Sequence, residues 1–402
     1  MITKINYMYI LLVLILVFPI TIIRRQFYFI TLVAAIFIIA VNLKYKFNNN
    51  LNSQIKLLLN FLIIIFSVYA LFLTIIIDTS LIFFTINKVI TLLFFITLLK
   101  LLSHKFSNKL LKYIEHFIFF VALFSIIFYF FNIDGFRLKP IFDITMKQEN
   151  LLRYNERRLS WFYEHKIQFA TTCLIGLQLL LLNTCCRYKY KILKVGIFIL
   201  AIYLSNSKLS LVLALFMVLF NSSKYIIKYL KNKRLNASIK VVLVCLLLIS
   251  IGLLPIFLVS IYSHINASRN LSTLGSRTII WRLVVDEVRN NPLGIIKAYG
   301  YYMSDGIRSF TTAHNFFLNE FLETGVIGGV ICLFINIIPL FLIRYSRYKL
   351  IIFEIIFIAQ FDYLISGMFA YVYYTLLAIL IIDSHYHRKC ILRQNKTLCS
   401  EM

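Results

Sequence analysis

The sequence predicts an all-α, polytopic integral membrane protein with about twelve transmembrane helices. Its 402 residues are 61% hydrophobic and only 14% charged, which is more apolar surface than a soluble domain can bury within itself. Runs of about 20 apolar residues, the length that a helix needs to cross a bilayer, recur along the chain. Apolar and polar residues do not alternate as they do in the strands of a membrane barrel, which argues against that class.

The apolar runs follow one another closely, so the whole chain, 1–402, is predicted to form a single membrane domain. The spans are expected near residues 5–23, 27–43, 57–77, 83–102, 114–133, 165–184, 192–206, 208–221, 239–261, 314–343, 350–366 and 367–383. The spans at 192–206 and 208–221 are short, and they form either two spans or one re-entrant pair. The last two spans are close enough in sequence to form a hairpin. The first 23 residues lack a small-residue cleavage site and are expected to remain as a span.

Lysine and arginine residues in the connecting segments predict the orientation. They concentrate in the segments 44–56, 100–113, 185–194, 222–240 and 344–349 and in the tail after residue 387. These segments fall on one face, which the positive-inside rule identifies as cytoplasmic, with the N- and C-termini on the same side. The net charge of +26 is therefore spread over loops at a membrane surface. That distribution favours contact with anionic membrane lipid and argues against a nucleic-acid partner.

Two long loops, 134–164 and 262–313, fall on the opposite, extracytoplasmic face, and both contain more arginine than lysine. Orientation requires only positive charge, so the preference for arginine indicates forked recognition of phosphate or carboxylate groups. The most polar long segment of the chain, Ser276–Gly328, begins in the second of these loops. We therefore expect an anionic substrate to bind there.

The residues 276–290 are predicted to form an amphipathic helix on the outer membrane surface. Ser276 is a suitable N-cap, and Pro292 marks the end of the helical pattern. An apolar stripe at helical spacing places an aromatic side chain at head-group depth. The stripe consists of Trp281, Val284, Val285 and Val288.

Arginines on this helix have two interpretations. Arg277 opens the helix, where free N–H groups and the helix dipole favour an anion, and no acidic residue lies three or four positions away. It is either an anion ligand or a surface arginine that extends towards water. Arg282 and Arg289 each have Asp286 within four residues, so either arginine can form an ion pair instead.

His314 marks the boundary between the second long loop and the next span. It is either an interfacial histidine or a catalytic group that faces the loop arginines. On a continuous helix, Gly325 and Gly328 would share its face and would let another helix approach closely. Glu323, deeper in the same span, is expected to support packing or a polar network, because unpaired carboxylates in lipid are costly.

Several motifs are missing from the sequence. Neither outer loop carries an Asp-x-Asp pair or a His/Asp cluster, so no bound metal is expected. No glycine-rich phosphate loop occurs in the cytoplasmic segments, and no pair of carboxylates marks a glycosidase. The sequence therefore predicts no cofactor and no step driven by ATP.

The motifs around His314 resemble those of the bacterial O-antigen polymerase and O-antigen ligase superfamily. The ligase-type signature is His, then Asn, Ser or Gln, nine residues, Gly, two residues, and Gly, Thr or Tyr. The matching residues are His314, Asn315, Gly325 and Gly328. Upstream, the segment from Ser276 to Gly294, with its arginine, its tryptophan and its Asn-Pro-Leu-Gly sequence, is similar to another block of this family.

Three further positions carry the resemblance, which covers about residues 150–335. Arg158, followed by Ser-Trp-Phe-Tyr-Glu at 160–164, resembles the family's block before a middle span. Lys208 lies where the family usually has arginine, and lysine keeps the charge but loses the fork. Arg289 and Gly300 have the loose Arg-x10-Gly spacing of the polymerases.

The resemblance implies a metal-independent membrane glycosyltransferase in the bacterial inner (cytoplasmic) membrane. Its donor would be an oligosaccharide on a polyprenyl diphosphate such as undecaprenyl diphosphate, and its acceptor a sugar hydroxyl. Such a reaction requires cations that stabilise the departing diphosphate and a base that accepts the proton of the acceptor hydroxyl. Histidine suits the role of the base, because its charge changes near neutral pH. We expect His314 and Arg277 to be catalytic. Diphosphate binding is assigned to Arg158, Arg277, Lys208 and Arg289, and supporting roles to Glu323, Asn315, Gly325, Gly328 and Trp281.

Polymerase and ligase share this chemistry and differ in the acceptor. We favour a polymerase that extends lipid-linked repeat units of O-antigen, capsule or a related lipopolysaccharide or surface polysaccharide. A ligase that transfers the glycan to lipid A core is the alternative, and a flippase or transporter for lipid-linked oligosaccharides is the alternative from another class. Expected partners are the lipid-linked oligosaccharide, membrane lipid, and chain-length regulator and flippase proteins.

Overall fold

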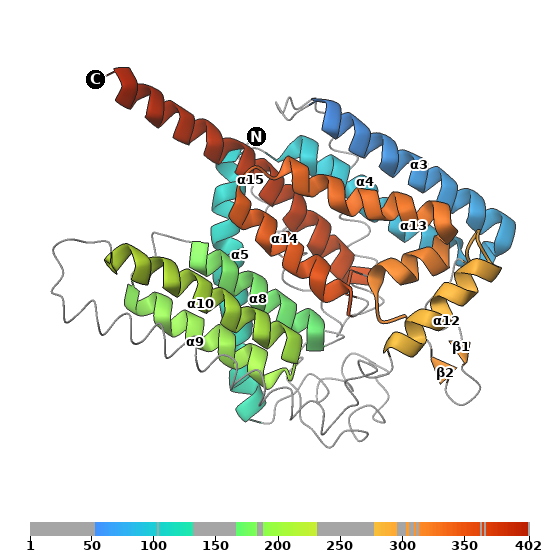
Figure 1. The fold of residues 1–402 in the computed structure, drawn as a ribbon, viewed down its shortest axis with the longest axis horizontal. Helices are drawn as coiled ribbons and strands as arrows, with labels where there is room; N and C mark the ends of the chain where they lie inside the picture. Colours follow the sequence, from blue (N-terminus) through green and yellow to red (C-terminus); the bar gives the residue numbers. More distant parts are fainter. Residues whose placement is uncertain are drawn as a thin grey trace.

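The computed structural model of the protein is almost entirely helical (Figure 1). It describes residues 53–102, 104–131, 166–182, 188–230, 277–295, 303–304, 309–310, 313–361, 364–365 and 367–400. The predicted spans at 5–23, 27–43 and 239–261 and most of the two long loops lie outside these residues, so the total of about twelve spans stays a prediction.

The α-helices follow the predicted pattern closely. They are α3 (Ser53–Ile77), α4 (Ile82–Leu101), α5 (His104–Phe130), α8 (Lys166–Leu182), α9 (Tyr188–Leu204), α10 (Lys208–Leu230), α12 (Arg277–Asn290), α13 (Phe316–Leu342), α14 (Ser346–Ala359) and α15 (Gly367–Ser400). Each coincides with a predicted span, except α12, which coincides with the predicted amphipathic helix. The short pair at 192–206 and 208–221 forms two separate helices, joined at Asn206 with its φ of 55°.

Two short elements complete the described structure. The 3-10 turn η2 (Thr79–Leu81) connects α3 to α4 and is capped by the side chain of Asp78. Strands β1 (Met303–Ser304) and β2 (Ser309–Phe310) pair antiparallel in the loop before α13. This two-residue pair is confined to a loop, so the described residues have the predicted all-α fold.

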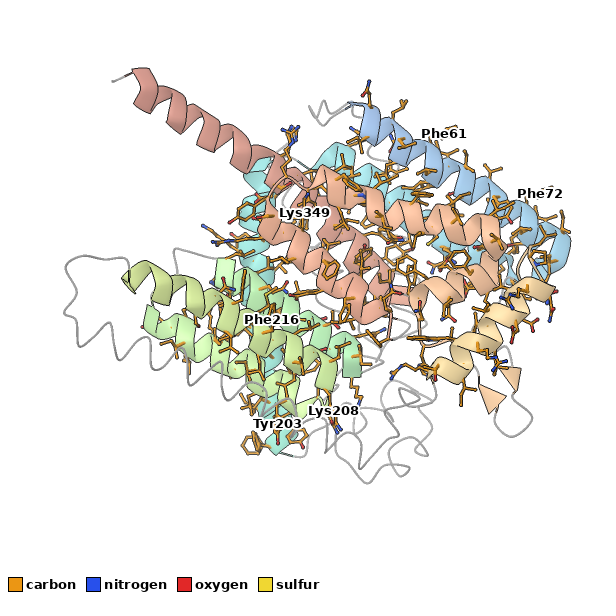
Figure 2. The ribbon with its side chains drawn as sticks, viewed as in Figure 1. Phe61, Phe72, Tyr203, Lys208, Phe216 and Lys349 are labelled. Carbon is orange, nitrogen blue, oxygen red and sulfur yellow. The ribbon has the colours of Figure 1, made fainter. Side chains whose placement is uncertain are left out.

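Membrane-spanning helices are evident from length and composition. Within the described residues, four segments are long and apolar enough to cross a bilayer: Gln54–Ile77, Thr79–Lys100, Leu110–Phe130 and Phe316–Leu342. Along α3, large apolar side chains project away from the neighbouring helices, and Figure 2 shows Phe61 and Phe72 on this face, 58% and 59% exposed. Such an apolar face is suited to lipid and not to water. The protein is therefore a multi-pass membrane protein.

The described helices form two groups that contact each other (Figure 1). One group contains α3, α4, α13 and α15, and the other contains α5, α8, α9 and α10. Helix α15 also packs on α5, and α14 contacts both groups, so a single apolar core runs through them. Helix α12 lies outside the groups and packs on α13.

Buried polar side chains link helices across this core. Thr74 on α3 and Thr85 on α4 are 2.7 Å apart between hydroxyl oxygens, and the Tyr348 hydroxyl of α14 donates to Asp383 of α15 at 2.6 Å. Such bonds hold helices together where lipid provides no hydrophobic driving force. We call the end of the bundle that holds η2, the α9–α10 turn and residues 360–361 the α12 end, because α12 lies there.

Candidate functional site

Helix α13 is interrupted at Gly325, so it consists of two helical halves, 316–324 and 326–342. Gly325 has φ 67° and ψ −170°, a backbone conformation that is essentially restricted to glycine. Figure 1 shows that α13 changes direction along its length. The expectation of one continuous helix from 314 to 343, with Gly325 and Gly328 on the face of His314, is therefore wrong.

The turn at residues 291–294 occupies the break. The N–H group of Val326 donates to the carbonyl of Pro292 at 3.0 Å, and the N–H group of Ile295 donates to the carbonyl of Leu322 at 2.9 Å. These bonds replace helical bonds that the interruption removes, which matters because unsatisfied backbone groups are costly in a membrane. We call Gly325 together with the turn 291–294 the joint.

Only glycines fit the two facing positions of the joint. A Cβ atom on Gly325 would lie 2.2 Å from the carbonyl oxygen of Pro292, and one on Gly294 would lie 2.4 Å from the backbone nitrogen of Gly325. Gly294 also has a φ of 90°, which L side chains rarely adopt. The Asn-Pro-Leu-Gly sequence and the first signature glycine are thus two halves of one contact.

The second signature glycine, Gly328, lies one turn beyond the joint. A Cβ atom there would lie 2.3 Å from the Thr324 side chain and 3.1 Å from the ring of Tyr69 on α3. The Tyr69 hydroxyl donates to the carbonyl of Thr324, directly before the break, at 3.2 Å. Gly328 therefore allows α3 to approach α13 closely and to complete the hydrogen bonding around the joint.

His314 lies directly before α13 and is held by its neighbours. Its backbone is left-handed, with φ 48°. The Asn315 side chain caps the helix by accepting the N–H bond of Leu318 at 3.1 Å. The Asn319 side-chain oxygen accepts the N–H bond of Ala313 at 3.0 Å. Both flanking residues are thus fixed, which restricts where the imidazole can point.

Trp281 connects α12 to the histidine segment. Its indole N–H group donates to the carbonyl of Ala313 at 3.0 Å, and its ring lies 6.3 Å from that of Phe361, between centroids. Ala313 is fully buried, so this bond forms away from water. Trp281 therefore fixes the residue next to His314, in addition to any contact with lipid head groups.

The apolar face of α12 differs in part from the predicted stripe. Ile280 and Val284 are buried against α13, beside Leu322, whereas Val285 is 41% exposed. The stripe was predicted to face the membrane surface, and Val285 lies on the part of it that α13 does not cover. The face of α12 that carries Ile280 and Val284 therefore packs on α13.

Arg277 is the first residue of α12 and is partly buried. It precedes Trp281 by four residues, so the two side chains lie on the same face of the helix, about 6 Å apart along its axis. Since Trp281 contacts Ala313, Arg277 lies one turn along the face that carries the histidine segment. The structure thus places Arg277, Trp281 and His314 at one corner of the molecule, which we call the α12 corner.

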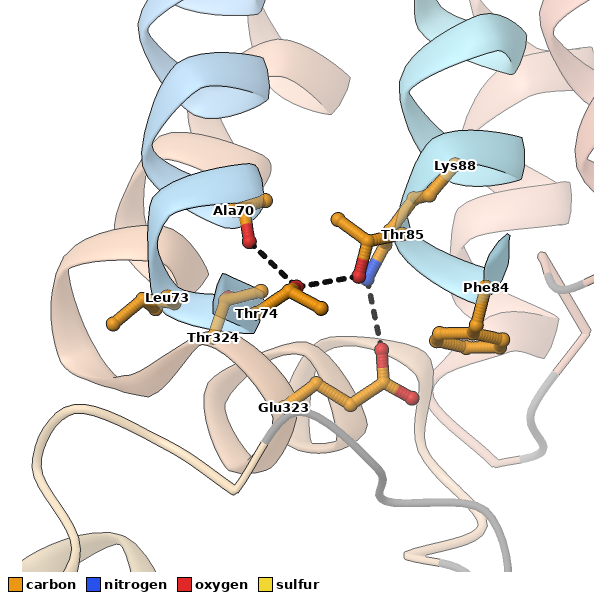
Figure 3. A pocket seen from close by; sticks show the side chains of 8 residues that line it. All are labelled: Ala70, Leu73, Thr74, Phe84, Thr85, Lys88, Glu323 and Thr324. Carbon is orange, nitrogen blue, oxygen red and sulfur yellow. Dashed lines mark hydrogen bonds and ion pairs between the residues drawn. The ribbon is translucent and has the colours of Figure 1, made fainter. Parts of the chain in front are cut away.

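A buried charge cluster lies behind the joint, between α4 and the first half of α13. The ammonium group of Lys88 donates to Glu323 at 2.8 Å (Figure 3). It also forms an ion pair with Glu320. Both carboxylates are 1% exposed, and the lysine side chain is 21% exposed towards a small pocket that Thr74 and Thr85 also line. Glu323 is thus part of a polar network within the membrane helices.

Lys88 is not among the site residues that the sequence predicts. The available signal was a lysine in the middle of an otherwise apolar predicted span, 83–102, since such residues are normally paired. Its partners follow 232 and 235 positions later in the sequence, so no local pattern could identify them.

Lys208 lies apart from this corner. It is the first residue of α10, and the preceding turn accepts a hydrogen bond from Lys166, whose ammonium group donates to the Asn206 carbonyl at 3.0 Å. Two cations thus lie near the α9–α10 turn, at the α12 end of the bundle. Figure 2 labels Lys208 at this end.

Arg289 has an acidic neighbour on its own helix. Its guanidinium lies 3.6 Å from the Asp286 carboxylate, and the two side chains are 76% and 52% exposed. The backbone of Arg289 lies about 18 Å from that of Arg277 along the axis of α12, because the two are twelve residues apart at 1.5 Å each. Arg158, Ser276 and Gly300, the remaining positions of the predicted site and motifs, lie outside the described residues.

These features define a class: a multi-pass helical membrane protein in which a signature histidine, asparagine and two glycines are organised around one interrupted helix. Residues 194–334 match the family model described as O-antigen ligase. This match supports the superfamily of O-antigen polymerases and ligases. The match begins in α9 and ends in α13, so it includes α12, the joint and His314. A comparison with curated proteins found no match.

Replacing Trp281 with phenylalanine should test how the histidine segment is held. The variant keeps the aromatic ring but leaves the buried carbonyl of Ala313 without its donor, which costs about 1–3 kcal/mol. We expect reduced polysaccharide synthesis at normal protein levels, with an output between those of wild type and His314→Ala. Val285→Ala, at an exposed position on the same helix, should change neither the polysaccharide synthesis nor the protein level. Equal synthesis by Trp281→Phe and wild type would show that this bond does not position the histidine.

Proposed function

We propose that the protein polymerises lipid-linked oligosaccharide repeat units at the outer face of the bacterial inner membrane. The family match supports an enzyme of the O-antigen polymerase and ligase type that acts on lipid-linked polysaccharide. The observation that carries the proposal is the corner where Trp281 joins the arginine-bearing helix to the segment of His314. A fixed base beside a cation is what glycosyl transfer from a diphosphate needs.

In the proposed reaction, a hydroxyl of the acceptor sugar attacks the anomeric carbon of the donor. The new C–O bond forms as the bond between that carbon and the diphosphate oxygen breaks, and the electron pair leaves with the diphosphate. His314 takes the hydroxyl proton, and the guanidinium of Arg277 donates hydrogen bonds to the departing oxygens. Diphosphate is a good leaving group, so the reaction needs no strong general acid.

Among the proposed diphosphate ligands, Arg277 has the strongest structural support. It opens α12, where the free N–H groups of a helix N-terminus favour an anion. Arg289 is engaged with Asp286 and begins about 18 Å further along α12, so it suits a more distant part of the substrate. Lys208 and Arg158 remain part of the proposal as additional ligands, with Lys208 at the same end of the bundle as α12.

A ligase is the second candidate, and one observation favours it. The family model that matches carries the description O-antigen ligase. The two candidates differ only in whether the acceptor is another lipid-linked repeat unit or lipid A core. A gel of surface polysaccharide from cells without the gene separates them: core with a single repeat unit indicates a polymerase. Bare core, with polymer retained on the polyprenyl carrier, indicates a ligase, and an unchanged ladder would exclude both roles in O-antigen.

Single substitutions test the proposed roles of His314 and Arg277. We expect His314→Ala to slow transfer by about 10²–10⁴-fold, the usual contribution of general-base catalysis, and Arg277→Ala by about 10²–10³-fold. Cells complemented with either variant should lack long polysaccharide although the protein is present in the membrane. Arg277→Lys should restore little, because lysine keeps the charge but not the forked geometry.

The matched control is Arg282→Ala, which removes an exposed arginine from the same helix and should leave the polysaccharide ladder unchanged. Normal ladders from both His314→Ala and Arg277→Ala would contradict the proposed mechanism.

A further inference from the structure

A second site lies at the other end of the bundle, between the C-terminal end of α8, the middle of α10 and the start of α14. It is an indentation of about 350 Å³, including the space at its open mouth. Its walls are largely apolar, with Leu182, Met217 and Phe220 among them. Figure 2 shows α10 and α14 here, with Phe216 on the first and Lys349 on the second labelled. We call this indentation the α8–α10–α14 site.

Gln178 presents an unused donor in this site. The residue is only 5% exposed, and its side-chain Nε2 atom is buried with no hydrogen-bond partner among the described residues. A buried amide without a partner costs about 1–3 kcal/mol. Since Gln178 lines the indentation, a ligand with an acceptor oxygen would satisfy it.

Arg347 adds a positive charge to the same site. It is partly buried in the wall of the indentation, and within the described residues no carboxylate forms an ion pair with it. A second cation, Lys191, contacts the lining residue Leu181, because its ammonium group donates to the Leu181 carbonyl at 3.1 Å. A guanidinium in apolar surroundings with no acid beside it favours an anionic ligand with forked oxygens.

The position of the site indicates where that ligand comes from. The helix ends around it adjoin the basic segments 185–194, 222–240 and 344–349, and it lies at the opposite end of the bundle from α12. Apolar walls open beside a cationic group suit a molecule with a charged head and hydrocarbon chains. Basic pockets between membrane helices on this predicted face are typical sites for anionic lipid head groups.

We propose that the α8–α10–α14 site binds the phosphate of an anionic phospholipid from the predicted cytoplasmic leaflet. The phosphate oxygens accept hydrogen bonds from Arg347 and from the amide of Gln178. The acyl chains lie along the apolar wall formed by Leu182, Met217 and Phe220. The proposal is independent of glycosyl transfer, because no residue of the α12 corner takes part.

The test uses the full-length protein, purified in detergent and freed of lipid. Phosphatidylglycerol, phosphatidylcholine and inorganic phosphate are added separately, and binding is measured by native mass spectrometry and by the unfolding temperature. We expect phosphatidylglycerol to bind and to raise the unfolding temperature, and the other two to do so much less. Arg347→Gln should weaken phosphatidylglycerol binding by about 10- to 100-fold, the range for losing a charge-assisted hydrogen bond.

Two further variants make the outcome decisive. Arg344→Gln removes an equal charge three residues away, at an exposed position outside the indentation, and should bind phosphatidylglycerol like the wild type. Gln178→Leu should raise the unfolding temperature without lipid, since it removes the buried donor, and should reduce the further rise that phosphatidylglycerol produces. Equal effects of Arg347→Gln and Arg344→Gln would overturn the site. An equal rise with inorganic phosphate would overturn the lipid as its occupant.

Discussion

Replacing Gly325 with alanine should destabilise the protein by about 3–5 kcal/mol, combining the cost of a glycine-only backbone conformation with that of overpacking. The added Cβ atom would lie 2.2 Å from the Pro292 carbonyl oxygen, a backbone atom that cannot move without displacing the turn 291–294. The expected result is a sharp fall in the amount of folded protein and a lower unfolding temperature in detergent. The α12 corner should be lost as well, because the turn holds the end of α12.

Gly196→Ala is the matched control for this substitution. Gly196 lies within α9, and a Cβ atom there would meet nothing within 4 Å. Alanine in a helix interior is favoured over glycine by about 1 kcal/mol, so this variant should be as stable as the wild type or more stable. If Gly325→Ala were as stable as Gly196→Ala, the joint would not have the geometry described.

Replacing Lys88 with methionine should cost about 3–5 kcal/mol, the range for removing one partner of a buried ion pair. Glu320 and Glu323 would be left without their cation at 1% exposure, inside a membrane helix bundle. We expect a lower unfolding temperature and less protein in the membrane. Synthesis should fall too, because these glutamates lie on the half of α13 that begins directly after the His314 segment.

Neutralising the cluster should reverse most of this loss. The triple variant Lys88→Met, Glu320→Gln, Glu323→Gln removes the lysine and both charges together, and replacing a whole buried ion cluster is often close to neutral. Lys112→Met, at an exposed position on α5, is the control and should change stability by no more than about 0.5 kcal/mol. Equal losses in the single and triple variants would show that lysine packing matters and its charge does not.

Local sequence patterns predicted the helices well and their junctions poorly. The ends of α4 and α8 and the separation of α9 from α10 follow from runs of apolar residues bounded by polar ones, a property of neighbouring positions. The break at Gly325 does not follow, because glycine within an apolar run also occurs where helices simply approach closely. The distinguishing fact is that the turn 291–294 lies against it, about 30 residues earlier in the chain.

The candidate site shows the same division. Residue type and resemblance singled out His314, Asn315 and Arg277. In the structure, Arg277 lies one turn of α12 from Trp281, which bonds to the residue before His314. Lys88 did not stand out, although a lone lysine in an apolar span was a signal, because its role depends on partners on another helix. The face of α12 was predicted in part from helical periodicity, but periodicity alone does not determine which edge of an apolar stripe is covered.

The joint also bears on how far related chains can diverge. Its two central hydrogen bonds, from Val326 to Pro292 and from Ile295 to Leu322, run between backbone atoms, so they place no demand on those residues' side chains. What the geometry requires is the absence of a Cβ atom at Gly294 and Gly325. Distant relatives with the same joint should therefore share little with this chain beyond glycines at that spacing. A search for those paired glycines should find members that overall sequence similarity does not reveal.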